Sequence, residues 1–188
     1  MDIWTVPLDS ERPLLLVGIE QERAARFRRE RDRIRWARAR SALRQTLGSY
    51  LGCGPLDLRF TYGPHGKPSI ENAPELRFNL SHSGDWAMIA VARGGIEVGV
   101  DIEHFRENVD IAALLRRVGE RDVPDTGTVA TIELYRRWAR REAASKTSGD
   151  PLLRKVDPLV CLADVDAPEG YAAAVGMMAF RPEPVYCG

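Results

Sequence analysis

Two long segments with helical periodicity flank a strand-rich centre, and this arrangement most constrains how the 188-residue chain can fold. Apolar residues recur at roughly helical spacing along residues 20–51 and again along 128–146. Between them lie a continuous apolar run, 86–92, and an alternating run, 96–103, whose lengths suit strands. Two long helices around a strand-rich centre predict a fold of the α+β class.

The two central strands are predicted to form a hairpin, because Gly94-Gly95 between them suits a tight turn. Along 96–103 the apolar side chains take alternate positions, so they share one face of the strand, and the acidic side chains share the other. The remaining expected elements are strands at 56–61, 77–80, 160–165 and 171–180, loops at 63–68 and 81–84, a short helix at 109–118 and a loose tail at 181–184.

Charge and cysteine content exclude several classes of protein. The 27 basic and 27 acidic side chains cancel, so no whole-molecule field favours nucleic acid. The apolar runs are too short for a membrane span, and the first residues lack the pattern of a secretory signal. Cys53, Cys161 and Cys187 are odd in number and widely spaced, which fits neither a disulfide framework nor a zinc knuckle. We therefore expect a cytoplasmic protein that binds neither nucleic acid nor membranes.

The basic residues are unevenly distributed. Of the 27, 24 are arginines, and 10 of these lie within residues 23–44. The polar face of the first long helix is therefore cationic; it is either a solvated face whose arginine stems cover apolar surface or a surface that binds anions. The chain retains lysine at three positions alone, Lys67, Lys146 and Lys155.

Two acidic residues are candidates for a metal site. Asp101 and Glu103 are two apart on a predicted strand, so both carboxylates project to the same side, and Gly99 beside them is expected to leave room for a ligand. Neighbouring carboxylates resist simultaneous ionisation unless a cation lies between them, and Mg²⁺ takes one or two carboxylates plus phosphate oxygens. The plainer interpretation of Asp-x-Glu alone is two exposed acids at a strand end.

A second pair of candidates lies on the second long helix. Glu142 and Lys146 are four apart, and Trp138 precedes Glu142 by four, so the three share one face. A Glu and Lys at this spacing are usually a surface pair. However, lysine is rare in this chain, and a desolvated ammonium beside a phosphate can act as a general acid.

Two polar loops could bind phosphate. Gly66-Lys67-Pro68 presents a lysine and backbone amides, although it is not a Walker motif, and Ser81-His82 offers a hydroxyl and an imidazole. A hydrolase triad of Ser81, His82 and Asp101 is disfavoured, because the side chains of adjacent residues such as Ser81 and His82 seldom reach one another. The sequence also contains no Gly-x-Ser-x-Gly elbow. The histidines show no paired-ligand spacing, which disfavours a zinc site.

In order, the motifs resemble those of Sfp-type 4′-phosphopantetheinyl transferases. They are Gly66-Lys67-Pro68, then 78–86 (FNLSHSGDW), 99–103 (GVDIE) and 138–146 (WARREAASK). The resemblance implies a pseudo-twofold fold of two similar α+β halves. The N-terminal half, 1–94, would hold the basic helix and the first two motifs, and the C-terminal half, 95–188, the last two. Coenzyme A and Mg²⁺, or Mn²⁺, would bind in the cleft between the halves of one compact unit.

The resemblance also implies roles for individual residues. The magnesium ligands would be Asp101, Glu103 and Glu142, so that Asp101 would also take part in cofactor binding. Lys67, between Gly66 and Pro68, would contact the phosphates of coenzyme A together with Ser81 and His82. Arg23 occupies the position where the family has a basic residue for the 3′-phosphate end.

The implied reaction transfers 4′-phosphopantetheine to a serine of an apo acyl or peptidyl carrier protein and releases 3′,5′-ADP. Glu142, directly or through water, would take the serine proton, and Lys146 would stabilise or protonate the leaving phosphate. Arg141 stands where the family usually has lysine, and residues 147–151 replace its Gly-x-Gly stretch. Two alternatives stay open: a relative that binds coenzyme A or another nucleotide without catalysis, and a Mg²⁺-dependent phosphohydrolase. A monomer is expected, since one chain contains both halves.

Overall fold

The computed structural model describes residues 1–63, 65–107, 109–123, 128–149 and 157–178. The described chain is a mixed structure of four helices and eight strands. The helices are α1 (Gly18–Ala25), α2 (Glu30–Leu51), α3 (Ile111–Arg117) and α4 (Thr128–Ser148). The strands are β1 (Asp2–Pro7), β2 (Phe60–Tyr62), β3 (Pro68–Ile70), β4 (Arg77–Ser83), β5 (Trp86–Ala92), β6 (Val98–His104), β7 (Val160–Asp164) and β8 (Tyr171–Met178).

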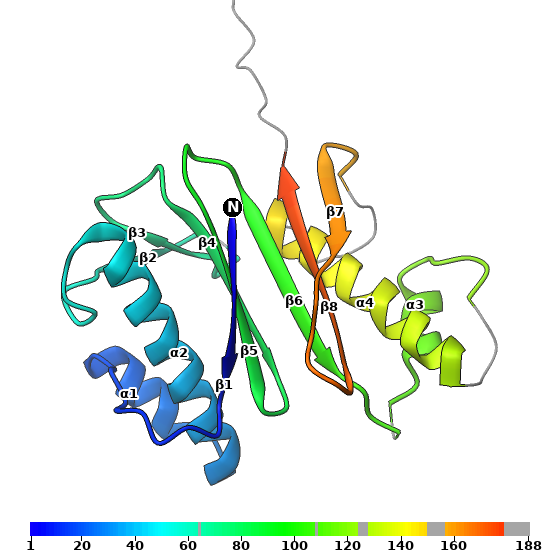
Figure 1. Cartoon of the computed structure of the whole chain (residues 1–188), viewed down its shortest axis with the longest axis horizontal. Helices are drawn as coiled ribbons and strands as arrows, with labels where there is room; N and C mark the ends of the chain where they lie inside the picture. Colours follow the sequence, from blue (N-terminus) through cyan, green and yellow to red (C-terminus); the bar gives the residue numbers. More distant parts are fainter. Residues whose placement is uncertain (64, 108, 124–127, 150–156, 179–188) are drawn as a thin grey trace, which may run out of the picture.

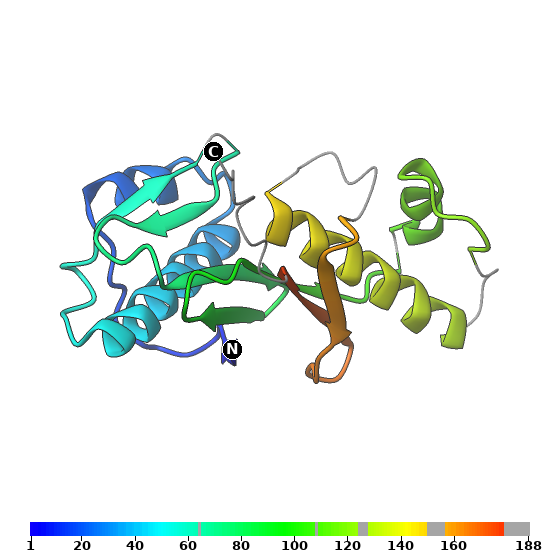
Figure 2. The same cartoon turned by 90° about the horizontal axis from the view of Figure 1, so that it is seen from above.

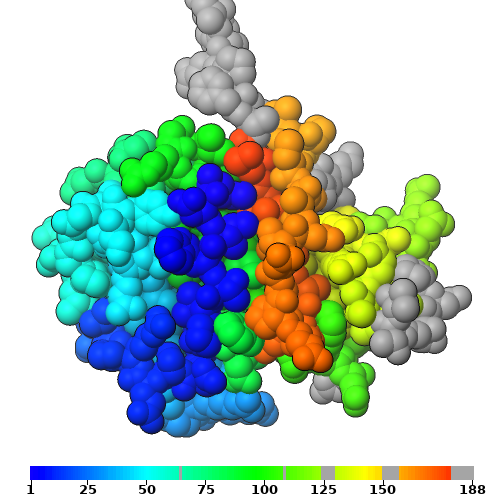
Figure 3. Space-filling view, in the orientation of Figure 1, coloured from blue at the N-terminus to red at the C-terminus, as the bar shows by residue number. Residues whose placement is uncertain are grey.

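Two antiparallel three-stranded sheets form the centre of the molecule. Their strand orders are β1-β5-β4 and β6-β8-β7, and β2 and β3 form a separate hairpin. Helices α1 and α2 lie on one side of the sheets, and α3 and α4 lie on the other (Figures 1 and 2). In the space-filling view, blue and cyan residues fill the left of the face and yellow to red residues the right (Figure 3). Among the described residues, no helix is long and apolar enough to cross a membrane.

The first core joins α2 to the first sheet. Leu43 and Leu47 of α2 belong to one buried cluster with Phe78 of β4 and with Ile89 and Val91 of β5. Leu43 and Leu47 are four residues apart, so they lie on the same face of the helix, and the arginine-rich remainder of α2 faces away from this cluster or pairs with acids.

The second core lies between the two sheets. Met88 and Ala90 alternate with the residues of the first core along β5, and they cluster with Val100 and Ile102 of β6 and with Val175 of β8. On the far side of the second sheet, alanines of α4 pack against β8. The order of layers is therefore helix, sheet, sheet, helix. The expected alternation along β6 is confirmed.

The expected hairpin of 86–92 with 96–103 is wrong. Strand β5 is already paired on both edges, with β1 and β4, and β6 pairs instead with β8. Gly94 and Gly95 both have positive φ, 75° and 73°, and they carry the chain out of the first sheet and into the second. The hairpin that does form joins β4 to β5.

Three other boundaries differ from expectation. The segment 20–51 contains two helices, because the chain leaves helical geometry between α1 and α2 and Arg29 takes an extended conformation. Strand β4 continues to Ser83, so 81–83 is strand and not loop. Of the expected strand at 56–61, only its end belongs to β2. The helices at 109–118 and 128–146 and the strands at 160–165 and 171–180 are confirmed within their described parts, and the tail at 181–184 lies outside the described residues.

Candidate active site between β4, β6 and α4

A row of polar side chains joins β4 to β6, which belong to different sheets. Every second residue of β4 takes part. Asn79 Oδ1 accepts from the backbone N–H of Val100 at 2.9 Å, and Ser81 Oγ donates to Asp101 Oδ1 at 2.8 Å. Ser83 Oγ donates to Glu103 Oε2 at 3.1 Å. These side chains replace the backbone ladder that neighbouring strands normally form.

Asp101 of the first candidate pair and Lys146 of the second are in direct contact. Lys146 Nζ donates to Asp101 Oδ1 at 2.5 Å and to Ser81 Oγ at 3.0 Å. The Asp101 side chain is 3% exposed and that of Lys146 is 28% exposed, so the ammonium lies between the buried carboxylate and solvent. Burial raises the pKa of Asp101 above its ordinary value, although Lys146 and Ser81 act in the opposite direction.

Glu103 lies on the same face of β6, two residues from Asp101, as its spacing predicts. Trp138 Nε1 donates to Glu103 Oε1 at 3.3 Å, so the face of α4 predicted to carry the site does meet β6. Burial, followed by the negative charge of Asp101, raises the pKa of Glu103 to about 6. The two carboxylates are therefore close enough to oppose each other's ionisation.

Glu142 belongs to the same group of charges. Burial raises the pKa of Glu142, Lys146 acts to lower it, and Asp101 acts to raise it. In the described part of the chain, Glu142 has no side-chain hydrogen bond. The site thus brings three half-buried or buried acids around one lysine.

The donor set suits a hard divalent cation. All three acids offer carboxylate oxygens, and Asp101 Oδ2 is buried without a hydrogen-bond partner. Burial raises the pKa of each carboxyl, and for Glu103 and Glu142 the charge of Asp101 adds to the effect, as expected where positive charge is deficient. However, no three acidic, histidine or cysteine side chains among the described residues already stand in a metal-binding cluster, and the ammonium of Lys146 takes the position beside Asp101 Oδ1.

The role expected for Gly99, to leave room for a ligand, is wrong. A Cβ atom on Gly99 would lie 2.3 Å from the carbonyl oxygen of Ala143 and 2.5 Å from the backbone nitrogen of Thr147. The missing side chain therefore lets α4 approach β6, and this approach brings Lys146 to Asp101.

Lys67 lies apart from Ser81 and Lys146. Its Nζ donates to Glu97 Oε2 at 2.7 Å and to the carbonyl oxygens of Val98 and Thr147, both at 3.1 Å. Lys67 thus links the β2–β3 hairpin to the start of β6 and to the last turn of α4. Gly66 and Pro68, its neighbours, contribute to the wall of a large cavity.

His82 and Ser81 point to opposite faces of β4, because they are adjacent on a strand. Ser81 is buried in the polar row, whereas His82 is exposed. The surrounding protein, followed by the positive charges of Lys146 and Arg35, lowers the pKa of His82. The charge of Lys146 therefore acts on the His82 imidazole, although the two groups form no hydrogen bond.

A cavity of about 750 Å³ opens between α1, α2 and the β2–β3 hairpin. Arg23 lines it, with its guanidinium 5.5 Å from the centre of the Trp36 ring, and the Phe27 ring lies tilted beside Trp36 with the ring centres 5.8 Å apart. Asn79 and Leu80 of β4 also line the cavity, which therefore reaches the strand that carries Ser81. Arginines and aromatic rings together suit a ligand with both phosphate and a flat base.

Comparison with known proteins identifies the family. A family model described as 4′-phosphopantetheinyl transferase, N-terminal, matches residues 12–93. A relative from Synechocystis sp. is 34% identical over 160 residues, which are 78% of this chain and 64% of that protein. The 4′-phosphopantetheinyl transferase HetI of Nostoc sp. is 32% identical over 168 residues, which cover 81% of this chain and 70% of HetI. The chain belongs to the 4′-phosphopantetheinyl transferase family. The predicted resemblance is confirmed.

A third 4′-phosphopantetheinyl transferase, Sfp of Bacillus subtilis, is 25% identical over 154 residues, which cover 79% of this chain and 67% of Sfp. The chain thus spans about two thirds of the length of these relatives. The matched family region includes α1, α2 and β2 to β5, and so both the arginine-lined cavity and the strand with Ser81.

The sequence did not point to Asn79 and Ser83. Both side chains fasten β4 to β6, beside Ser81. Their signal was present as a polar residue at every second position of 79–83, but it carries meaning once β4 and β6 are known to be neighbours.

Proposed function

We propose that this family member transfers the 4′-phosphopantetheine group of coenzyme A to a serine of an apo acyl or peptidyl carrier protein and releases 3′,5′-ADP. The observation that carries the proposal is the contact of Lys146 with Asp101 and Ser81 between two further acids. This group of charges includes Ser81 of β4, and the two preceding residues of that strand, Asn79 and Leu80, line the arginine-rich cavity.

Asp101, Glu103 and Glu142 would hold Mg²⁺, or Mn²⁺. The unpartnered Asp101 Oδ2 and the raised pKa values support this, because a cation would satisfy the first and relieve the second. When bound, the ion would neutralise the diphosphate and polarise its oxygens.

The side chains of the site have distinct tasks in the proposed reaction. Glu142 takes the proton of the carrier serine, directly or through water. Lys146, held between buried Asp101 and solvent, stabilises or protonates the leaving phosphate. Ser81 and His82 would bind phosphate oxygens from opposite faces of β4, so each would bind a different oxygen. Lys67 would bind phosphate after exchanging its carbonyl acceptors for the ligand.

Coenzyme A would enter with its nucleotide end in the cavity lined by Arg23, Gly66 and Pro68. The rings of Phe27 and Trp36 support stacking on adenine, and Arg23 is placed for the 3′-phosphate. The two halves, 1–94 and 95–188, would be related by a pseudo-twofold axis, in keeping with one long helix and one three-stranded sheet in each. We further propose a monomer in the cytoplasm, where the exposed free thiols of Cys53 and Cys161 would stay reduced.

One experiment tests the proposed function. The protein is incubated with coenzyme A, Mg²⁺ and a panel of apo acyl and peptidyl carrier proteins, and each carrier is weighed by intact-protein mass spectrometry. We expect one carrier at least to gain the mass of a single phosphopantetheine. A carrier whose target serine is replaced by alanine is the matched control.

The alternatives predict different products. A non-catalytic binding protein would leave every carrier unmodified while still binding coenzyme A. A phosphohydrolase would cleave coenzyme A without any carrier and release 4′-phosphopantetheine. Either result would contradict the proposed transfer.

A further inference from the structure

A buried carboxylate in the wall of the large cavity ties α1 to α2. Glu20, on α1, is 3% exposed. Its Oε1 accepts from Arg40 Nε, and its Oε2 accepts from Arg44 Nε at 2.7 Å and from the backbone N–H of Val17 at 3.1 Å. Burial acts to raise the pKa of Glu20, but the hydrogen bonds from Arg44 and Arg40 outweigh it and lower the pKa, so the group is ionised.

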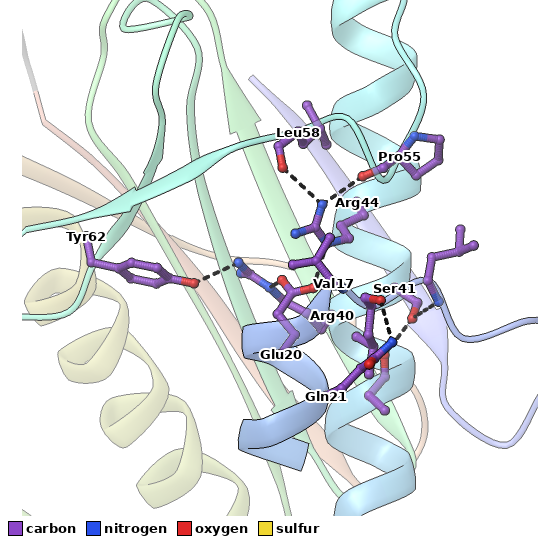
Figure 4. Close-up of polar contacts among 12 residues, drawn as sticks. Val17, Glu20, Gln21, Arg40, Ser41, Arg44, Pro55, Leu58 and Tyr62 are labelled. Atoms are coloured by element: carbon purple, nitrogen blue, oxygen red, sulfur yellow. Dashed lines mark hydrogen bonds and ion pairs between the residues drawn. The ribbon is translucent and has the colours of Figure 1, made fainter. Parts of the chain in front are cut away.

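The two arginines bound by Glu20 have different surroundings. Arg44 is 1% exposed, and its Nη1 donates to the carbonyl oxygens of Pro55 at 2.8 Å and Leu58 at 3.2 Å. Arg40 lines the cavity, and its Nη2 donates to Tyr62 Oη at 3.0 Å. Figure 4 shows Arg40 held between Glu20 on α1 and Tyr62 on β2. Arg44 therefore has a structural role within the fold, whereas Arg40 lies at the cavity wall.

The cluster of Glu20, Arg40 and Arg44 carries one positive charge in excess. One carboxylate faces two guanidiniums, and the remaining acid in the cavity wall, Glu22, is exposed to solvent. The Arg40 side chain is 9% exposed, and its Nη1 makes no hydrogen bond within the described part of the chain. A buried guanidinium with unused N–H groups at a cavity wall is a ready donor to phosphate.

We propose that Glu20 is a positioning residue for nucleotide binding: by holding Arg40 Nε, it keeps the unused N–H groups of Arg40 at the cavity wall, where they bind a phosphate of the nucleotide end of coenzyme A. This inference rests on the proposed function, since it assumes that the cavity receives coenzyme A. The Phe60 ring also packs against the guanidinium, with its centre 4.0 Å from Arg40 Cζ.

The test measures binding of 3′,5′-ADP, a probe with the nucleotide end alone, by titration calorimetry. We expect Glu20→Gln to weaken this binding about tenfold, because the amide keeps the shape of the side chain but no longer orients Arg40 by charge. The KM for coenzyme A should rise to a similar extent, while kcat at saturating coenzyme A stays within about twofold of the parental value.

Glu133→Gln is the matched control. Glu133 also lies within ion-pair distance of two arginines, Arg137 at 3.2 Å and Arg140 at 3.7 Å, but on α4, away from the cavity. Its loss should leave 3′,5′-ADP binding unchanged. In an Arg40→Gln background, Glu20→Gln should have no further effect on affinity, because Glu20 acts through Arg40. An additional loss in that background would overturn the assignment, since it would indicate a general structural effect.

Thermal unfolding and circular dichroism check that each variant is folded at the assay temperature. If Glu20→Gln is not, Tyr62→Phe decides, because it removes one hydrogen bond from Arg40 at an exposed side chain. Unchanged 3′,5′-ADP affinity in Tyr62→Phe would then overturn the inference. If the parental protein and folded Glu20→Gln bind 3′,5′-ADP with equal affinity, this inference alone is overturned. Parental protein that binds neither 3′,5′-ADP nor coenzyme A overturns the proposed function as well.

Discussion

Asp101 has one oxygen occupied by Ser81 and Lys146 and one oxygen buried without a hydrogen bond. Burying an ionised carboxylate oxygen without a partner costs free energy, and a bound cation would offset this cost. We therefore expect transfer to require Mg²⁺ or Mn²⁺ and Asp101→Ala to reduce it about 100-fold or more. The measurement is the initial rate with Mg²⁺ and with excess EDTA. Exposed Asp166→Ala, the control, should alter stability by less than about 0.5 kcal/mol and leave the rate unchanged. Full activity in EDTA would contradict the prediction.

Glu142 separates binding from chemistry. Glu142→Gln keeps the size of a side chain that makes no hydrogen bond within the described residues, so the variant should fold normally and still bind coenzyme A. Transfer should slow about 10²–10⁴-fold, the usual contribution of a general base. Single-turnover rates and coenzyme A titrations measure the two effects separately. A parental rate in this variant would mean that Glu142 takes no part in the chemistry.

Glu103 makes the stability of the metal-free protein depend on pH. Its pKa is raised from 4.5 to about 6 in the folded state, so between these values the folded state binds more protons than the unfolded state. The contribution of Glu103 to the unfolding free energy therefore falls as pH rises through this window. We expect Glu103→Gln to gain stability relative to the parent between about pH 4 and pH 7, measured by urea unfolding in EDTA. An equal difference at both ends of that range would contradict this.

The residues of the site differ in how far their roles could be predicted. The spacing of Asp101 and Glu103, and of Glu142 and Lys146, correctly placed each pair on one face, because strand and helix periods are local properties. The contact between the pairs depends on how α4 sits on β6, which no local pattern contains. The ion pairs of Glu20 could not be predicted for the same reason, since its partners lie 20 and 24 residues away in the sequence.

At the scale of the elements, close packing of α4 on the second sheet holds the site together. Gly99 and Gly176 both admit the helix: a Cβ on Gly176 would lie 2.4 Å from Thr147 Oγ1. On β6 the obstacle is backbone, which does not move aside as a side-chain end does. The relative position of Lys146 and Asp101 is thus determined by two missing side chains.

Gly99→Ala tests this packing. The added methyl group would collide with the backbone of Ala143 and Thr147, so we expect a loss of about 1–3 kcal/mol of unfolding free energy and a lower transfer rate at temperatures where the variant is still folded. Gly18→Ala is the control, because a Cβ there meets nothing within 4 Å. Urea unfolding at one pH measures both variants. Equal unfolding free energies of the two variants would show that α4 can shift away from β6 without a measurable loss of stability.

Most elements could be predicted, but not their partners. The runs at 86–92 and 96–103 contain the strands β5 and β6 as predicted, because the apolar pattern and the length of a run are local signals. Their pairing with each other was the expectation from the Gly94-Gly95 turn. It failed because β1, from the start of the chain, takes the edge of β5 that a hairpin would need. Strand pairing is decided by competition among distant segments, which the local turn does not report.

At the scale of the whole molecule, the two sheets meet through side chains and not through a shared backbone ladder. Asn79, Ser81 and Ser83 cross from the first sheet to the second, and Lys67 joins the β2–β3 hairpin to β6 and α4. The class α+β could be predicted from the order of helices and strands. A twofold relation of the halves is implied by the family resemblance alone, because the two halves share no repeat visible in the sequence.

The basic segment 23–44 has consequences for the encounter with a carrier protein. Several of its arginines are committed to the fold: Arg40 and Arg44 bind Glu20, and Arg35 binds Asp85. Others remain at the surface, including Arg28 and Arg29 between α1 and α2. Carrier proteins of this kind are acidic around the modified serine, as the family resemblance implies. The exposed arginines would therefore attract them from a distance and turn the serine toward the site.

Such attraction acts on the encounter rate and is screened over about 8 Å at physiological ionic strength. We expect the KM for an acidic carrier to rise with salt, and Arg28→Glu/Arg29→Glu to raise it at low salt and flatten the salt dependence. Arg12→Glu/Arg59→Glu changes the net charge equally at exposed positions outside the segment, so it should have a much smaller effect. Coenzyme A binding, followed in parallel, isolates the carrier's contribution. A carrier KM that stays constant from low to high salt would mean that these arginines are a solvated helix face and no docking surface.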